Sequence, residues 1–224
     1  MRAAAQSPSP DADAALAELC QLYWLPVYAF VRRSGHDPDA ARDLTQDFFV
    51  RVLEKHYFKD ARPERGRFRS FLIASVRHFL AKERHYDRAL KRGGRHVHVP
   101  IEIDDGERKY QREFADTETP ERIYERGWAQ AVLDAAMDRV AVRYPSGPKR
   151  QVFLRLRTSL LSDERQVYAQ MAADLGTTEG ALRVAAHRLR QQLGVALEEV
   201  IADTVGDPEE MADELRHVRA SLAR

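Results

Sequence analysis

The chain has 224 residues, 44% hydrophobic and 32% charged, so it can form two small domains, or one of ordinary size, with real cores. The formal net charge of +1 means that a nucleic-acid site must come from local segregation of charge. The single cysteine, Cys20, excludes an internal disulfide framework and fits a reducing cytosol. Without a long apolar run or signal-peptide core, we expect a cytoplasmic protein with no membrane insertion. Because helix formers dominate, we expect an all-α fold.

The N-terminal part predicts a disordered start and two helices. Residues 1–10 are small and rich in Pro and Ser. A first helix is expected over residues 14–33, with Pro26 inside it. A second helix starts at Asp37-Pro38, a capping residue followed by proline. Its apolar side chains lie on more than one face, which indicates either burial by its own domain or a surface kept for a partner.

Cations are concentrated between residues 62 and 95, where eleven Lys or Arg residues stand against three acids. A third helix is expected over residues 68–88. Its apolar face lies opposite a stripe formed by Arg77, Arg84 and Arg88. Such a bias, spanning loop and helix with aromatics between the cations, is typical of a surface for nucleic-acid phosphates. A solvated charged face is the alternative.

Residues 92–118 are polar, contain a Gly-Gly pair and lack helical periodicity, which indicates a connector. His96 and His98 have no companion ligand motif, so we expect no metal site. Further helices are expected over residues 119–144, 149–159 and 208–222, the first of them opened by a cap followed by proline.

The stretch from Tyr168 to Leu193 predicts two helices joined by a tight turn. Gly176 supplies the left-handed backbone that ends one helix, and Thr177 or Thr178 caps the next. This arrangement predicts a helix-turn-helix, whose second helix commonly lies in the DNA major groove. Two packed helices with a solvated basic face are the alternative. The outer face of the second helix carries Gly180, Val184, His187 and Gln191, and Arg183 and Arg188 lie on its flanks.

The order of these parts resembles bacterial sigma factors of the sigma-70 family, in the two-domain extracytoplasmic-function (ECF) type. The family's region 2.2 is similar to ARDLTQDFFVRVLEK, and its segment that contacts the −10 element is similar to RGRFRSFLIASVRHFLAKE. Region 4.2, which reads the −35 element, is similar to YAQMAADLGTTEGALRVAAHRLRQQL. The resemblance implies five parts: a disordered N-terminus 1–10, a region 2-like domain 11–95, a linker 96–118, a region 4-like helix-turn-helix domain 119–205 and a helical C-terminal extension 206–224.

The resemblance implies a non-enzymatic protein, without cofactor or metal, that brings RNA polymerase core to promoter DNA. The implied polymerase contacts are the beta-prime clamp helices and the beta flap, and an anti-sigma factor or a regulatory kinase is a candidate regulator. Core binding is implied for Asp43, Gln46, Asp47, Phe49 and Leu53. Binding to the −10 element is implied for Tyr57, Phe58, Arg65, Arg67, Arg77, Arg84 and Arg88. Binding to the −35 element is implied for Thr178, Glu179, Gly180, Arg183, Val184, His187 and Arg188.

Three features depart from the family pattern. Phe71 stands where a tryptophan is usual, and Val184 and Ala185 stand where polar residues are common, so the promoter sequence does not follow from the family. The extension after residue 205 is extra, and we expect it to fold back on the DNA-binding domain or to regulate it.

A helix-turn-helix regulator that never contacts polymerase core is the alternative function. It leaves Phe49, Leu53 and the acids beside them unexplained. An enzyme acting on nucleic acid has little support, because the chain carries neither an HExxH motif nor a P-loop.

Overall fold

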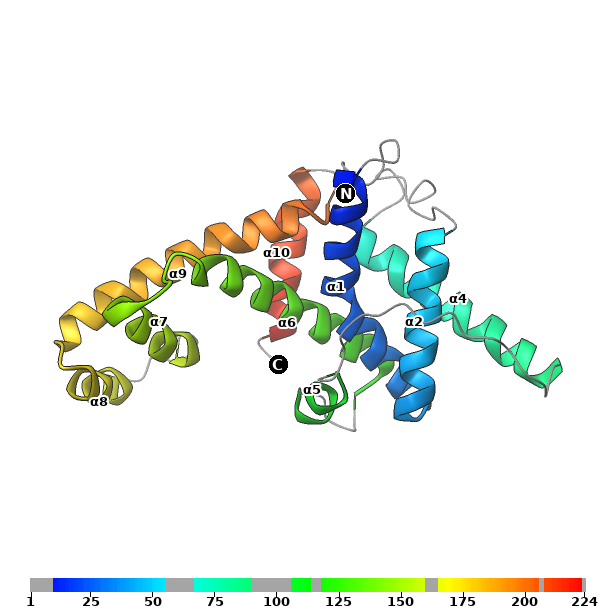
Figure 1. Ribbon diagram of the computed structural model, residues 1–224, viewed down its shortest axis with the longest axis horizontal. Coiled ribbons are helices and arrows are strands. Elements are labelled where there is room, and N and C mark those ends of the chain that lie inside the picture. The colour runs from blue at the N-terminus through cyan, green and yellow to red at the C-terminus, as the bar shows by residue number, and fades with distance from the viewer. Residues whose placement is uncertain are drawn as a thin grey trace. The chain divides into compact units, whose positions relative to one another are not determined.

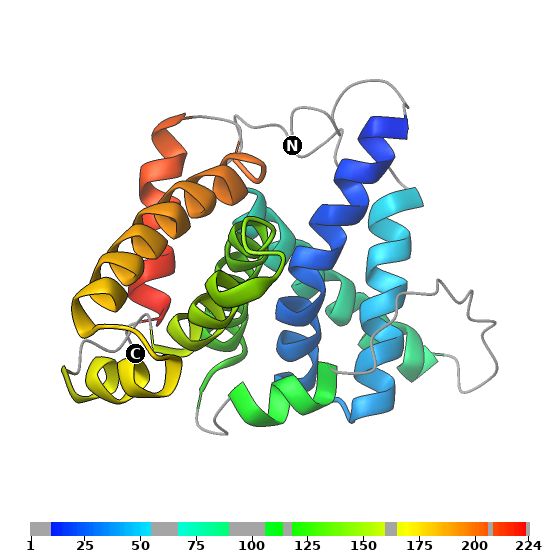
Figure 2. The same ribbon diagram turned by 60° about the vertical axis from the view of Figure 1, so that its left-hand side comes forward.

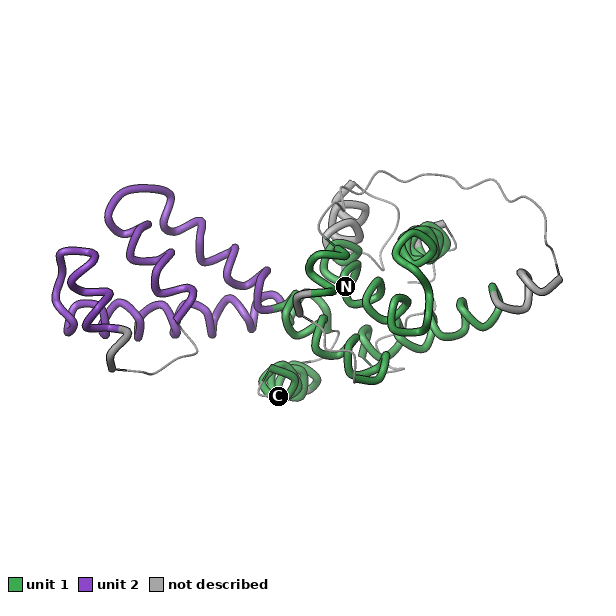
Figure 3. Tube along the Cα trace, turned by 90° about the horizontal axis from the view of Figure 1, so that it is seen from below, with its two compact units in different colours: residues 1–132, 201–224 green, residues 133–200 purple. Residues whose placement is uncertain are grey.

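The computed structural model describes residues 10–54, 67–89, 106–113, 118–159, 165–205 and 208–222. Every regular element in these ranges is an α-helix (Figure 1), so the predicted all-α fold is confirmed. The chain divides into two compact units (Figure 3). Unit 1 comprises residues 1–132 and 201–224, and unit 2 comprises residues 133–200.

Unit 1 is built mainly from the N-terminal helices and the C-terminal helix. In Figure 2, α1 in dark blue and α2 in light blue lie side by side, and the two helices are in contact. The long helices α6 and α9 each have residues in both units. The helices with residues in unit 1 are α1 (Pro10–Arg33), α2 (Pro38–Glu54), α4 (Phe68–Ala89), α5 (Gly106–Glu113), α6 (Pro120–Ala141), α9 (Glu179–Ala202) and α10 (Pro208–Leu222).

The core of unit 1 is rich in aromatic side chains. Tyr23 of α1 lies edge to face with Phe68 of α4, with 5.1 Å between ring centroids, and its hydroxyl accepts a 3.1 Å hydrogen bond from Trp128 Nε1 of α6. All three side chains are buried. Burial raises the pKa of the Cys20 thiol to about 12, so the single cysteine stays neutral inside this core. One network of aromatic contacts thus joins α1, α4 and α6.

Two helix starts predicted from a cap followed by proline are confirmed. Asp37 Oδ1 accepts a 2.9 Å hydrogen bond from the Ala40 amide, and α2 begins at the next residue, Pro38. Thr119 Oγ1 accepts a 3.3 Å hydrogen bond from the Arg122 amide, at the start of α6. In both cases the side chain satisfies an amide that has no partner within its own helix.

Unit 2 contains α7 (Gly147–Ser159), α8 (Arg165–Leu175), most of α9 and the end of α6. The predicted turn between α8 and α9 is confirmed. Gly176 has a φ of 61°, and Thr178 Oγ1 accepts a 3.2 Å hydrogen bond from the Ala181 amide. The buried side chains of α7, α8 and α9 include Phe153, Leu156, Tyr168, Leu182 and Leu189.

Two expectations about the connecting segments are corrected. Residues 106–113 fall in the stretch expected to be a connector without periodicity, yet they form α5. This helix packs on α1, where its Glu107 side chain binds Arg32. The C-terminal extension was expected to fold back on the DNA-binding domain or to regulate it. The first alternative is not found for the helix-turn-helix domain, because α10 belongs to unit 1, together with the N-terminal helices, and the second stays a prediction. In both cases the segment is positioned by contacts with residues far away in the sequence, Arg32 for α5 and Arg67 for α10.

Candidate nucleic-acid and partner surfaces

The candidate partner surface on α2 is narrower than the sequence indicated. Asp43 is exposed and Asp47 is half-buried, but Gln46 is only 7% exposed and Phe49 only 3%. The Phe49 ring lies 5.4 Å from that of Phe48, edge to face. The expectation of an apolar surface at Phe49 is therefore wrong, because the wide apolar coverage of α2 reflects burial by its own unit. The side chain of Leu53 lies outside the described residues.

The outer face of α4 carries an exposed cation between two small residues. Arg77 is exposed, as are Ala74 and Ala81 one turn or so on either side of it. Arg77 Nη2 donates a 2.5 Å hydrogen bond to Glu121 Oε1 at the start of α6. The other residues proposed for this face have side chains outside the described residues: Tyr57, Phe58, Arg65, Arg84 and Arg88.

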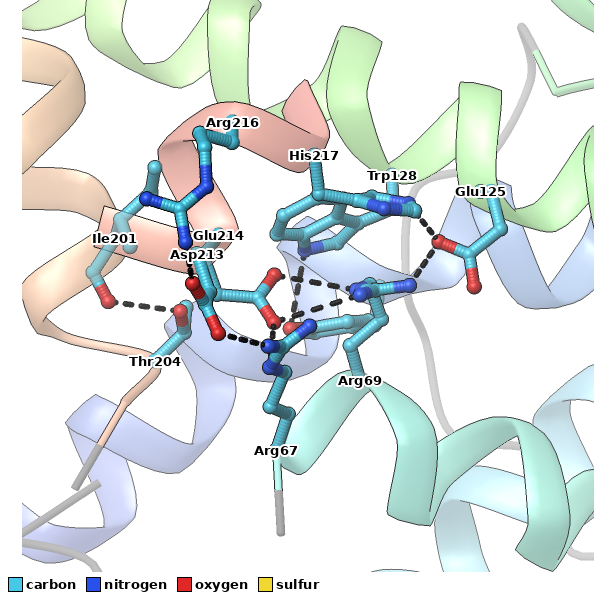
Figure 4. A network of polar contacts seen from close by, with 11 residues as sticks. Arg67, Arg69, Glu125, Trp128, Ile201, Thr204, Asp213, Glu214, Arg216 and His217 are labelled. Carbon is cyan, nitrogen blue, oxygen red and sulfur yellow. Dashed lines mark hydrogen bonds and ion pairs between the residues drawn. The ribbon is translucent and has the colours of Figure 1, made fainter. Parts of the chain in front are cut away.

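At the start of α4, Arg67 and Arg69 lie in a cluster of ion pairs with α10 and α6 (Figure 4). Arg67 Nη2 lies 2.6 Å from Asp213 Oδ2, and Arg67 Nε lies 3.2 Å from Glu214 Oε1. Arg69 Nε lies 3.2 Å from Glu214 Oε2, and Arg69 also binds Glu125. We call Arg67, Arg69, Glu125, Asp213 and Glu214 the arginine cluster.

The arginine cluster has a buried centre. The side chains of Arg69 and Glu214 are 5% and 2% exposed, and the Arg69 guanidinium carbon lies 4.8 Å from the centre of the Trp128 ring. Tyr124 Oη donates a 3.0 Å hydrogen bond to the Arg69 carbonyl oxygen. Desolvation raises the pKa of Tyr124, so its hydroxyl stays protonated and remains a donor. Contacts on several sides thus fix the position of Arg69.

Residues of α10 complete this network on the side of α6. His217 Nε2 lies 2.5 Å from Glu125 Oε2, and the His217 ring is 5.9 Å from that of Trp128. Arg216 pairs with Asp213 within α10 itself. Asp213 therefore lies between Arg216 of its own helix and Arg67, the residue directly before α4 (Figure 4).

The role of Arg69 was not predicted. Arg69 is one of the eleven cations between residues 62 and 95, which were expected to face phosphates or solvent. A usable signal was present, because Arg69 precedes Leu72 and Val76 by three and seven residues and so shares their buried helical face. A single buried cation predicts an acidic partner, but the position of that partner 145 residues later in the chain could not be read from the sequence.

The residues proposed for the −35 element come together on the outer face of α9 and its cap. Thr178, Gly180, Arg183, Val184, His187 and Arg188 are exposed, and Glu179 is half-buried. Val184 is 52% exposed and so is accessible to a ligand of this face.

Arg183 is held in place by two residues of unit 2, Glu179 and Tyr168. Arg183 Nη2 and Nε lie 2.5 and 3.0 Å from Glu179 Oε1, and its guanidinium carbon lies 5.2 Å from the centre of the Tyr168 ring. Arg190 Nη2 donates a 3.2 Å hydrogen bond to the hydroxyl of the same tyrosine. The Arg183 side chain is therefore oriented before any ligand arrives.

Neither a metal centre nor a membrane span emerges from the described part of the chain. No group of three or more His, Cys, Asp or Glu residues there could hold a metal ion. No helix there is both long and apolar enough to cross a membrane. His96 and His98 lie outside the described residues.

Residues 20–89 match the family model of sigma-70 region 2. The match starts in α1, contains α2 and ends with the last residue of α4, so it covers the helices that carry Asp43 and Arg77, and also Arg67 directly before α4. The comparison with curated proteins and the comparison with solved structures each find no match.

The match supports the assignment of this chain to the sigma-70 family, whose proteins are non-enzymatic transcription factors. It thereby supports a role as a sigma factor in promoter recognition, with RNA polymerase core and promoter DNA as the implied partners.

Proposed function

We propose that the protein is a sigma factor of the ECF type that binds RNA polymerase core, recognises −10 and −35 promoter elements and assists strand opening. The region 2 match across α1, α2 and α4 carries this proposal. Arg77, an exposed cation of α4, lies within the matched residues, where a nucleic-acid surface is needed. On this proposal the protein acts in the cytoplasm, and an anti-sigma factor or a kinase is its candidate regulator.

In this proposal, α2 binds the beta-prime clamp helices of the polymerase. The exposed carboxylate of Asp43 and the half-buried Asp47 are the accessible groups that support it. Because Phe49 and Gln46 are buried, they support the shape of α2 and do not offer contact area themselves. Leu53 remains a proposed contact. The interface is therefore proposed to depend on charge more than on a central aromatic side chain.

The −10 element is proposed to lie along α4 and the loop before it. The exposed Arg77 between Ala74 and Ala81 supports a backbone contact, since small neighbours allow a strand to approach closely. Arg84 and Arg88 would extend this contact, and Arg65 and Arg67 would add cations near the loop. Tyr57 and Phe58 are the proposed platforms on which an unstacked base would rest.

The −35 element is proposed to bind unit 2, with α8 and α9 as the helix-turn-helix and α9 in the major groove. The common exposure of Gly180, Arg183, Val184 and His187 on α9 supports this orientation. Thr178, Glu179 and Arg188 flank the face. The same unit would contact the beta flap of the polymerase.

Transcription in vitro with purified bacterial core polymerase tests the proposal. The template is a library of random sequence placed upstream of a reporter, and start sites are mapped on the transcripts. We expect the full chain to direct initiation at start sites that share two upstream elements, and a tagged copy to retain core. A protein that selects DNA sequences but neither retains core nor yields transcripts would instead be a helix-turn-helix regulator.

A further inference from the structure

We propose that α10 is an intramolecular competitor of nucleic acid, and that Arg67 and Arg69 form a phosphate-binding site which its carboxylates occupy. The inference rests on the proposed function in one respect, namely that unit 1 binds promoter DNA. It adds a site to that unit and a segment of the same chain that covers it.

The geometry of the arginine cluster matches phosphate recognition. Arg67 and Arg69 each direct Nε to a different oxygen of Glu214, both at 3.2 Å. Arg67 Nη2 also donates a 2.6 Å hydrogen bond to Asp213 Oδ2. Guanidinium groups bind carboxylates and phosphates through the same parallel donors, so two arginines that converge on one carboxylate are also placed to converge on one phosphate.

Release of α10 would leave a cationic site. Asp213 and Glu214 would leave with the helix, so Arg67 would lose the two carboxylates it pairs with, and Arg69 would keep that of Glu125. This excess of positive charge lies at the start of α4, within the region 2 match. A nucleic-acid backbone is the anionic ligand that the rest of α4 is built to accept.

Arg69 would keep its position without α10. Its guanidinium stays against the Trp128 ring and Glu125, both on α6, and its carbonyl oxygen keeps the hydrogen bond from Tyr124. The site therefore does not collapse when the helix leaves, and one of its two donors is already oriented.

The attachment of α10 is polar enough to be reversible. Among its described side chains, from residue 210 to residue 222, only Glu214 and Val218 are buried. Besides the His217 ring against Trp128, the contacts described from α10 to Arg67 and Arg69 are ion pairs, which gain little net free energy because both charges lose water. A helix held mainly by charge can be displaced by a polyanion that brings its own charges.

The first test measures binding of the full chain to a fluorescein-labelled 20-nucleotide oligothymidylate. Glu214→Gln removes one masking charge and keeps an acceptor for the arginines. Glu210→Gln is the matched control, since it makes the same charge change on the same helix outside the arginine cluster. We expect Glu214→Gln to bind about three- to tenfold more tightly than the parent, the scale of one charge-assisted contact. Glu210→Gln should change the affinity much less.

The salt dependence separates a new phosphate contact from a general charge effect. With Glu214→Gln the slope of log affinity against log salt should steepen by about 0.7, the value for one additional contact on a single strand. Adding Arg67→Gln to Glu214→Gln should remove the gain. Equal affinities of the Glu214→Gln and Glu210→Gln variants, with unchanged thermal unfolding midpoints, would overturn the proposal.

A second test uses the unmodified chain and so does not depend on the folding of a variant. Hydrogen exchange of the α10 amides is compared with and without the oligothymidylate. Competition predicts faster exchange across residues 214–222 when the probe is bound. Unchanged or slower exchange would show that α10 stays docked as a permanent part of unit 1. If promoter-directed transcription succeeds while α10 does not respond, only this inference fails. If no probe or promoter DNA binds, the proposed function fails with it.

Discussion

Arg32 of α1 and Glu107 of α5 are joined by two parallel hydrogen bonds of 2.9 Å, from Nε to Oε2 and from Nη2 to Oε1. Tyr28 donates to the same carboxylate, and the Arg32 guanidinium carbon lies 5.1 Å from the centre of the Tyr110 ring. The hydrogen bond from Arg32 is the main cause that lowers the pKa of Glu107. This pair anchors a helix of only eight residues, which would be marginal by itself.

Glu107→Gln should lower the free energy of unfolding by about 1 kcal/mol at neutral pH, the scale of one hydrogen bond to a charged group in a partly buried setting. Because the pKa of Glu107 is lowered by folding, its ionisation stabilises the folded state above the unfolded-state pKa of about 4.3. That contribution is lost as the pH falls through the lower, folded-state pKa. Urea unfolding of parent and variant should therefore differ at pH 7 and converge below about pH 4. A difference that stays constant with pH would contradict this role.

The sequence predicted local structure well where one or two residues determine it. Asp37 and Thr119 mark helix starts because their side chains bond amides three residues away, and Gly176 marks a turn because it takes a positive φ. These interactions are contained in a short window and can be read without knowing the fold.

The non-local contacts could not be predicted in the same way. Helix α5 depends on Arg32, 75 residues before Glu107, and its eight residues include only one large ring, that of Tyr110, to mark a buried face. Phe49 and Arg69 have residue types that fit an exposed interface as well as a packed one, and only their burial in the fold decides between these. The C-terminal extension was recognised as a helix, but its docking against Arg67 depends on tertiary charge pairing.

Substitution by alanine should change the stability of the protein in different directions at three glycines of unit 2. Gly176 has a φ of 61°, so Gly176→Ala should destabilise the protein by about 1 kcal/mol although no atom lies within 4 Å of the added methyl group. Gly180 and Gly194 lie inside α9 and have equally open surroundings, so alanine should stabilise each by about 0.5–1 kcal/mol. Thermal unfolding tests these signs.

The same variants test the approach of DNA to α9. Gly180 is on the face proposed for the major groove, so Gly180→Ala should weaken binding to a selected −35 sequence despite the added stability. Gly194→Ala is the control, because it makes the same change further along the helix. Equal DNA affinity of the two variants would show that Gly180 does not lie against DNA.

Asp43→Arg should abolish retention of core polymerase while leaving the unfolding midpoint unchanged, because Asp43 is exposed on α2. Asp39→Arg, on the same helix and with 93% of its side chain exposed, is the control and should retain core. A pull-down with purified core measures both. Loss of core with both variants would indicate a general charge effect and not a contact at Asp43.

Phe49→Ala should act through stability. Because Phe49 is buried against Phe48, truncation should cost about 3–5 kcal/mol of folding free energy. Any loss of core binding by this variant should therefore be accompanied by a lower unfolding midpoint. If the variant failed to retain core polymerase although its unfolding midpoint was unchanged, Phe49 would have to reach the polymerase after a rearrangement of α2.

Arg183→Ala and Arg188→Ala should have different effects on DNA selection. Arg183 is oriented by Glu179 and by the Tyr168 ring, which suits a contact to a base edge worth about 1–3 kcal/mol of discrimination. Its loss should relax the preferred sequence in a selection from random DNA. Arg188 lies beside this face, so its loss should weaken binding to all sequences alike. An unchanged preferred sequence for Arg183→Ala would exclude it as a base reader.

Strand opening should depend on the cations of α4. Arg77 is exposed and is paired only across the surface with Glu121, a contact that a phosphate can replace at little cost. We expect Arg77→Ala combined with Arg84→Ala to retain core polymerase but to block promoter melting, because the opened strand loses two backbone contacts. Arg122→Ala, an exposed cation of α6 in the same unit, is the matched control.

Permanganate footprinting of the −10 region measures this melting. The double variant should lose thymine reactivity, the Arg122→Ala control should keep it, and a pre-melted template should restore transcription to the double variant. The rescue is expected because α4 would then no longer have to capture a strand against the free energy of base pairing. Tyr57→Ala should likewise be rescued in part, since its proposed task is to hold an unstacked base. Normal thymine reactivity in the double variant would show that the outer face of α4 does not take part in opening the promoter.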